Sequence, residues 1–180
     1  MDEDLRLIEK YCSGNEEALE ELVLKYQKQV YGLIYRMTND IEEAKDLTQK
    51  TFLNVIKGIK DFRRESSFKT WLYRIAINVG LNHRKSRHEE VELEELLKGD
   101  QPGALSRIIE KERRIYIRKS LAEIPERQRL ALLLRVYEGL SLSETAQVMG
   151  CSEGAVKANY HNAVKRLKEI LKVKGYETKP

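Results

Sequence analysis

The chain has 180 residues, a length that suits one ordinary domain or two small ones. Its 33 basic and 29 acidic residues give a formal net charge of +4, and a hydrophobic fraction of 41% argues against a disordered chain. No apolar run approaches the roughly 20 residues that span a bilayer, and the acidic residues at positions 2–4 do not fit a secretory signal peptide.

The first part of the chain predicts a series of helices. Only ten Gly and three Pro occur in the whole sequence, and apolar residues recur at helical spacing up to residue 37, with a Ser-Gly-Asn interruption at residues 13–15. Asp40 and Glu43 then fit a capping box, which begins a further helix that ends near residue 59. A polar loop follows at residues 61–67, and the next helix runs from about residue 68 to residue 85.

This last helix has an apolar stripe and a second, polar face. The polar face carries Trp71, Arg74, Asn78, Asn82 and Lys85. Such a face suits nucleic acid, because cations hold phosphates while a flat ring stacks on an exposed base. A tryptophan packed in the core beside a solvated charged edge would produce the same spacing, so the sequence leaves both possibilities open.

Charge is distributed unevenly along the chain. Residues 1–62 carry a net charge of −4, residues 63–88 of +6, residues 89–112 of −5 and residues 113–180 of +7. Two basic blocks separated by an acidic one suggest two surfaces that face polyanions. Ordinary solvated helix faces would give the same balance, so charge alone does not decide.

The acidic stretch separates two predicted domains. Residues 89–103 end in Gly, Asp and Pro residues that break regular structure, which indicates an exposed linker with at most one short helix, at residues 91–97. We therefore expect an all-α fold with one helical domain at residues 1–88, a flexible acidic linker at residues 89–106 and a second helical domain at residues 107–175.

Two helices are predicted to open the second domain. The first covers about residues 105–123 and ends before Pro125, and the second covers residues 126–138. The face of this second helix that turns toward the core would be formed by Leu130, Leu133, Leu134 and Tyr137.

Residues 141–171 carry the spacing of a helix-turn-helix. Ser141 and Glu144 form a capping box, and Ala146 and Gly150 lie four residues apart, which permits a close helix crossing and a tight turn. The second helix of this unit has a polar and basic face suited to groove edges and phosphates. This face consists of Lys157, Asn159, His161, Asn162, Lys165 and Arg166. A helical hairpin with a solvated face is the alternative.

The sequence predicts no metal centre, cofactor or catalytic site. Cys12 and Cys151 lie far apart and form no CxxC pair, so they are expected to be reduced thiols in a cytoplasmic protein. The three histidines show no metal-ligand spacing with either cysteine. No nucleophile with a matching base is visible, and we therefore expect a protein that is not an enzyme.

Three segments, in order along the chain, resemble a known family. They are EEAKDLTQKTFLNVIKGIKDFR, FKTWLYRIAINVGLNHRKSR and IPERQRLALLLRVYEGLSLSETAQVMGCSEGAVKANYHNAVKRLKEIL. Over roughly residues 5–172 the chain resembles the bacterial RNA polymerase sigma factors of the extracytoplasmic-function group. The resemblance implies a sigma-2-like domain and a sigma-4-like helix-turn-helix domain. It also implies a transcription initiation factor that binds core RNA polymerase, directs it to promoters and assists DNA melting.

The resemblance also implies partners. The chain would bind core RNA polymerase at the clamp and flap regions of that enzyme, and promoter DNA at the minus-ten and minus-thirty-five elements. An anti-sigma factor, often anchored in the membrane, is a further expected partner. A cytoplasmic chain with no membrane insertion of its own would then reach the membrane only through that factor.

Roles of the first domain can be carried over to positions of this chain. By resemblance, Asp46, Gln49 and Phe52 would face the polymerase clamp, with Phe52 as an apolar anchor. A pocket for a flipped base of the nontemplate strand would be lined by Phe62, Arg63, Ser66, Ser67 and Asn78, with Trp71 near the upstream fork or in the core. The phosphate backbone would be held by Arg64, Lys69, Arg74, Arg84, Lys85 and Arg87.

The upstream element would be read by the helix-turn-helix. The positions that the resemblance assigns to this task are Ser152, Lys157, Ala158, Asn159, His161, Asn162, Lys165 and Arg166. Many relatives carry several arginines here, and arginine is the usual bidentate reader of guanine, whereas asparagine can bridge adenine. We therefore expect this chain to read its upstream element differently from those relatives.

Two other functions remain to be weighed against initiation. A free-standing helix-turn-helix regulator would bind a palindromic operator as a dimer, but it leaves the polar surface of residues 62–78 without a task. An all-helical adaptor that binds only proteins would show no salt-dependent affinity for DNA.

Overall fold

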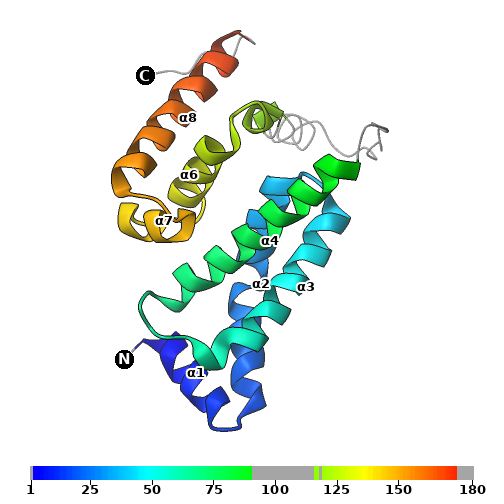
Figure 1. Cartoon of the computed structure of the whole chain (residues 1–180), viewed down its shortest axis with the longest axis vertical. Helices are drawn as coiled ribbons and strands as arrows, with labels where there is room; N and C mark the ends of the chain where they lie inside the picture. Colours follow the sequence, from blue (N-terminus) through cyan, green and yellow to red (C-terminus); the bar gives the residue numbers. More distant parts are fainter. Residues whose placement is uncertain (1, 91–115, 118, 174–180) are drawn as a thin grey trace, which may run out of the picture.

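The computed structural model describes residues 2–90, 116–117 and 119–173, and the side chains of residues 84–90 and 173 are not part of that description. Helices account for most of this part of the chain, and none of its residues lies in a strand. The helices, which Figure 1 shows, are α1 (Glu3–Cys12), α2 (Glu16–Thr38), α3 (Ile41–Gly58), the 3-10 helix η1 (Ile59–Asp61), α4 (Phe68–Glu90), α6 (Glu126–Val136), α7 (Leu142–Met149) and α8 (Glu153–Val173).

The N-terminal domain is built from α1 to α4. Helix α2 packs against α1, α3 and α4, and α3 packs against α4. The apolar stripes of these helices meet in one core, as the helical spacing of the sequence predicts. Its most deeply buried side chains include Leu7, Leu22, Val30, Leu33, Ile34, Phe68, Leu72 and Tyr73.

Side-chain caps fix where these helices begin. The carboxylate of Asp40 accepts a hydrogen bond from the backbone N–H of Glu43 at 2.9 Å, which confirms the predicted start of α3. The amide oxygen of Asn15 caps α2 in the same way by accepting from the N–H of Ala18 at 3.2 Å. Helix α2 ends at Thr38, and the following residue, Asn39, has a left-handed backbone (φ 60°) that turns the chain into α3.

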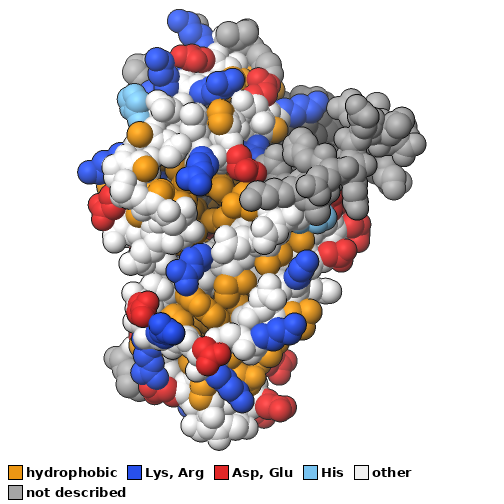
Figure 2. All heavy atoms as spheres, viewed as in Figure 1, with side chains coloured by type: hydrophobic (Ala, Val, Ile, Leu, Met, Phe, Trp, Pro, Cys, Tyr) orange, Lys and Arg blue, Asp and Glu red, His pale blue; other side chains and the backbone are white. Residues whose placement is uncertain are grey.

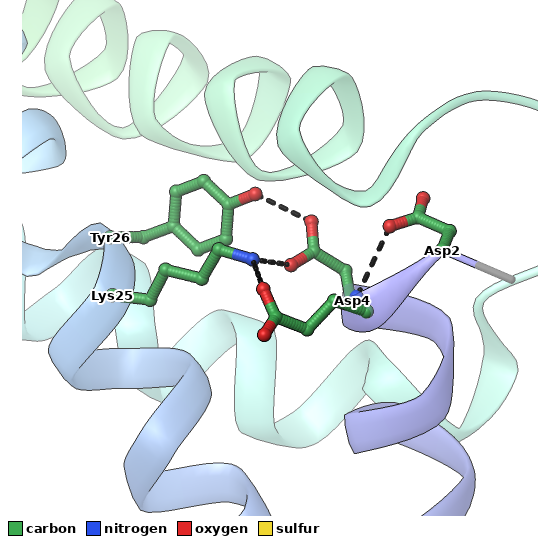
Figure 3. Close-up of polar contacts among 5 residues, drawn as sticks. Asp2, Asp4, Lys25 and Tyr26 are labelled. Atoms are coloured by element: carbon green, nitrogen blue, oxygen red, sulfur yellow. Dashed lines mark hydrogen bonds and ion pairs between the residues drawn. The ribbon is translucent and has the colours of Figure 1, made fainter.

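A buried carboxylate ties α1 to α2. Asp4 accepts hydrogen bonds from the Tyr26 hydroxyl at 2.5 Å and from the Lys25 ammonium at 2.7 Å, and Lys25 also pairs with Glu3 at 2.6 Å (Figure 3). Burial and the neighbouring carboxylate raise the pKa of Tyr26 well above its usual range, so the phenol keeps the proton that it donates.

The C-terminal domain contains the predicted helix-turn-helix. Helix α7 begins with the Ser141–Glu144 capping box and is followed by Gly150, whose backbone is left-handed (φ 60°), so both predicted features are confirmed. Helix α6 packs against both α7 and α8. The core of this domain includes Leu133, Leu134, Leu140, Val156 and Ala163.

Tyr137 does not face the core of this domain, contrary to the prediction from helical spacing. Helix α6 ends at Val136, so Tyr137 lies past its last turn and is 45% exposed. Its ring instead contacts the N-terminal domain, where the guanidinium of Arg36 lies 4.3 Å above the ring centroid.

The two domains touch through α4 and α7. In Figure 1, α6, α7 and α8 form a group at the upper left, and α7 is the member of that group nearest to the start of α4. Helix α4 extends to Glu90, two residues past the predicted domain end at residue 88. The predicted linker beyond that point, its short helix at residues 91–97 and most of the helix at residues 105–123 lie outside the described residues.

Candidate nucleic-acid interface

A pocket of about 450 Å³ opens where the 61–67 loop meets the first turns of α4. Its aromatic side consists of Phe62 and Trp71, whose ring centroids lie 5.2 Å apart, with the buried Phe68 ring 5.8 Å from that of Trp71. Polar and charged groups share the lining with these rings. The lining residues are Asp61, Phe62, Arg63, Glu65, Ser66, Thr70, Trp71, Arg74 and Gln147.

Trp71 is packed against the core and also presents surface at the pocket, so both positions that its spacing left open apply. Its indole packs on the aromatic cluster and on the backbone of α3, because a Cβ built on Gly58 would lie 3.4 Å from its Cζ2 atom. The residue is nevertheless only half-buried and lines the pocket. A ring held in this way is rigid and still presents surface to a ligand.

Most of the predicted base-pocket residues meet at this pocket, and two do not. Phe62, Arg63 and Ser66 line it, but Ser67 and Asn78 are not among the lining residues. Ser67 instead caps α4, since its hydroxyl oxygen accepts from the N–H of Thr70 at 3.1 Å. Asn78 is exposed on α4, one turn beyond Arg74.

The basic residues predicted to hold phosphates differ in their surroundings. Arg74 is exposed at the pocket, whereas Arg64, in a left-handed conformation (φ 60°), pairs with Glu9 at 3.0 Å. Lys69 donates from Nζ to the backbone carbonyl of Glu138 at 2.9 Å, across the contact between domains. The side chains of Arg84, Lys85 and Arg87 lie outside the described part of the chain. Figure 2 shows Lys and Arg side chains spaced among hydrophobic ones on the face turned to the viewer.

Helix α8 presents the predicted reading face to solvent. Ser152 begins the helix by accepting from the N–H of Ala155 at 3.2 Å. Asn159 is half-buried, and its Nδ2 donates to the carbonyl of Ala155 at 2.9 Å, which holds the amide against the helix. The exposed positions of this face are Lys157, Ala158, His161, Asn162, Lys165 and Arg166.

The predicted polymerase-binding residues on α3 fall on two different faces. Asp46 and Gln49 are exposed, but Phe52 is only 8% exposed and belongs to the core. The apolar side chain that continues the exposed face is Leu53, which is 58% exposed and lies seven residues, two helical turns, after Asp46. Helical spacing could have identified Leu53, because it lies off the buried stripe of α3.

Two residues near the pocket were not identified from the sequence. Gln147 of α7 lines the pocket from the other domain, and the side chain of Glu138, from the turn between α6 and α7, reaches α2 and α4. Both contacts join positions more than 60 residues apart, and no local pattern reports them.

Across the described ranges, no group of three or more His, Cys, Asp or Glu side chains could hold a metal ion. None of the helices in the described part of the chain is long and apolar enough to cross a membrane.

Comparisons with known proteins match both domains. The family models of Sigma-70 region 2 and Sigma-70 region 4 match residues 22–90 and residues 114–167. The RNA polymerase sigma-H factor of Pseudomonas aeruginosa is 36% identical, with 94% of each chain covered, and the ECF RNA polymerase sigma-E factor of Escherichia coli is 31% identical, over 89% of this chain and 90% of its own. The solved structure of the sigma factor RpoE with the anti-sigma factor NepR from Bartonella quintana superposes with a TM-score of 0.70 at 25% identity, covering 86% of this chain and 96% of that chain.

Proposed function

The chain belongs to the extracytoplasmic-function group of the sigma-70 family and is a transcription initiation factor that binds core RNA polymerase, and we propose that its two domains have separate tasks in initiation. The N-terminal domain binds polymerase and captures a base of the melted strand. The C-terminal helix-turn-helix binds the duplex upstream. A free-standing operator-binding regulator is not favoured, because the relatives match the chain over both domains.

The aromatic and basic pocket is the observation that carries this division. Extracting a base from a duplex costs a few kcal/mol, which stacking and polar contacts in a pocket must offset. Phe62 and Trp71 offer rings for stacking, and Ser66 offers a hydroxyl for the edge of a base. Arg63 and Arg74 place cations at the same pocket, where they would neutralise the adjoining phosphates.

Helix α8 supplies the second DNA contact of the proposal. Its exposed Lys157, Lys165 and Arg166 suit phosphates, while Asn162 presents an amide that can pair with adenine. The Asn159 amide already donates one Nδ2–H to the carbonyl of Ala155, which leaves its oxygen as an acceptor and its second N–H as a donor for a base.

Polymerase binding is assigned to the exposed face of α3. Asp46, Gln49 and Leu53 lie on that face, and together they offer a carboxylate, an amide and an apolar side chain. An exposed leucine beside polar groups offers apolar surface that a protein partner can bury. Phe52 supports this surface from below, within the core.

An anti-sigma factor is the remaining partner in the proposal. The RpoE protein of Bartonella quintana was solved in complex with the anti-sigma factor NepR, and this chain shares its fold. A partner that covers the α3 face or the pocket would prevent polymerase or DNA from binding. The chain is proposed to work in the cytoplasm, where polymerase and promoter DNA are found, and to act without catalytic groups of its own.

Two double variants test the division of labour. Asp46→Ala with Leu53→Ala should weaken binding of the labelled chain to purified core RNA polymerase by tenfold or more, as expected when an apolar anchor is lost. Glu20→Ala with Leu24→Ala is the matched control, because it also removes one exposed carboxylate and one exposed leucine, on α2. The control should bind core polymerase as the unchanged chain does.

The complementary double variant is made in α8. Asn159→Ala with Asn162→Ala should leave binding to core polymerase unchanged and reduce the use of the upstream promoter element. The measurement compares holoenzyme binding to duplexes with and without that element. Equal damage to polymerase binding by both doubles would contradict the proposed division.

A further inference from the structure

Glu138 places a carboxylate from the C-terminal domain inside the N-terminal domain. Its side chain is only 6% exposed, although it lies in the turn between α6 and α7. The hydroxyl of Tyr73, on α4, donates to Oε2 at 2.7 Å, and the guanidinium of Arg36, on α2, lies 3.6 Å from Oε1. One carboxylate is therefore held by two helices of the other domain.

The turn that carries Glu138 makes two more contacts with the N-terminal domain. Lys69 donates to the backbone carbonyl of Glu138 at 2.9 Å, and the ring of Tyr137 lies under the Arg36 guanidinium. The turn itself is held in shape, because the N–H of Glu138 bonds to the carbonyl of Leu133 at 3.3 Å. Burial beside the Glu138 carboxylate raises the pKa of Tyr73 far above its usual range, so the phenol remains a donor.

This contact brings α7 over the pocket. Gln147, near the end of α7, forms part of the same lining as Phe62, Trp71 and Arg74. A DNA strand that entered the pocket would have to share it with the C-terminal domain. Lys69, which the resemblance assigns to the phosphate backbone, donates one of its ammonium N–H groups to the backbone carbonyl of Glu138 in this arrangement.

We propose that Glu138, with Tyr73, Arg36 and Lys69, is an autoinhibitory latch that holds the helix-turn-helix domain over the base pocket of the unbound protein. The proposal rests on the proposed function only in taking this pocket as the DNA-strand site. The latch is made of charged and polar groups, all of which water can solvate once the domains separate, so the contact suits reversible closure. DNA phosphates favour the open state, because they compete with the backbone carbonyl of Glu138 for the Lys69 ammonium.

The protein carries its own labelling sites for a test. Its two cysteines lie one in each domain, Cys12 in α1 and Cys151 after α7, and both have exposed surface. Nitroxide labels on the two thiols report the distance between domains by double electron–electron resonance, without polymerase or DNA. The unchanged chain should give one narrow distance distribution, and Glu138→Gln should add a broad, longer component.

The sole tryptophan provides a second readout. Trp71 lines the pocket beside Gln147, so separation of the domains should raise the quenching of its fluorescence by acrylamide. Glu138→Gln should increase the ratio of open to closed molecules about tenfold, since the ion pair with Arg36 is lost and the Tyr73 hydroxyl then donates to a neutral acceptor. Tyr73→Phe should act in the same direction and to a smaller extent, with Arg36 still in place.

Glu169→Gln is the matched control, because it changes the net charge equally at an exposed position of α8. It should leave both readouts unchanged, and circular dichroism should show equal helix content in all variants. The proposal is overturned if the unchanged chain is already open. It is also overturned if Glu138→Gln leaves distance and quenching unchanged, or if Glu169→Gln opens the domains as much. Polymerase binding enters none of these measurements, so their failure is distinguishable from failure of the proposed function.

Discussion

Tyr26 donates a 2.5 Å hydrogen bond to the carboxylate of Asp4, which lies 22 residues earlier in the chain. Both residues are buried, and Lys25 completes the set with an ammonium 2.7 Å from the same carboxylate. A buried carboxylate is stable only when its charge is paired and its oxygens accept hydrogen bonds. The cluster therefore fixes α1 against α2 (Figure 3) and supports the domain that carries the pocket.

Removal of the Tyr26 hydroxyl should destabilise the N-terminal domain. We expect Tyr26→Phe to lower the free energy of unfolding by about 1–3 kcal/mol, because a hydrogen bond to a buried charged group is lost. Trp71 fluorescence during urea unfolding reports this domain, since it holds the only tryptophan of the chain. Tyr31→Phe, a half-buried tyrosine on the same helix, is the control and should cost less.

Stability should fall at alkaline pH because of the buried phenols. Burial raises the pKa of Tyr26 and of Tyr73 above the ordinary value of 10.0. Above pH 10 the unfolded chain loses these protons while the folded chain keeps them, so the free energy of unfolding decreases as pH rises. Below pH 10 the contribution is complete. Urea unfolding between pH 8 and about 11 measures this slope, which Tyr26→Phe should reduce; an unchanged slope in that variant would exclude Tyr26 as a cause.

The capping box of α7 should stabilise the C-terminal domain. Ser141→Ala should cost about 0.5–2 kcal/mol, because the hydroxyl that accepts from the N–H of Glu144 is lost. Hydrogen bonds from Ser141 lower the pKa of Glu144, so its contribution is present at neutral pH and is lost as pH falls through that lowered pKa. Hydrogen exchange of the α7 amides measures the effect. Equal exchange rates in the variant and the unchanged chain would show that the box contributes little.

Arg74 should contribute one phosphate contact at the pocket. Arg74→Ala should reduce the slope of log affinity against log salt by about 0.7 for promoter binding by the holoenzyme, the value for one contact with a single strand. Binding to core polymerase should not change, since Arg74 is exposed on α4 and the proposed polymerase face is on α3. Arg6→Ala, an exposed arginine of α1, should leave the slope as it is. An unchanged slope for Arg74→Ala would remove this residue from the interface.

Features that depend on neighbours in the sequence could be predicted. The Asp40 cap, the Ser141 capping box and the Gly150 turn each follow from local backbone chemistry, and the structure contains all three. The resemblance predicted which kind of helical domain each half of the chain forms. The family matches confirm the sigma factor assignment. Three of the five residues predicted to line a base pocket do line one cavity, because the loop and the first turns of α4 are adjacent in the chain; their role toward a base stays a prediction.

Features that depend on long-range packing could not be predicted. Helical periodicity predicted that Tyr137 lies in the core. The residue instead follows the end of α6, and its ring contacts the Arg36 guanidinium of the other domain. The resemblance placed Phe52 on a binding face, yet it sits on the buried side of α3 while Leu53 is exposed. The burial of Glu138 depends on how two separate domains meet, and no local pattern specifies that contact.

Transcription by reconstituted holoenzyme tests directly whether the chain directs core polymerase to promoters. Cognate core polymerase would be mixed with the chain and genomic DNA, and the 5′ ends of the transcripts mapped. We expect discrete start sites that appear only with the chain, share an upstream element and fade when an excess of housekeeping sigma factor competes for core. An active core that binds the chain but gives no specific start sites, or a core that does not bind it at all, would exclude this role.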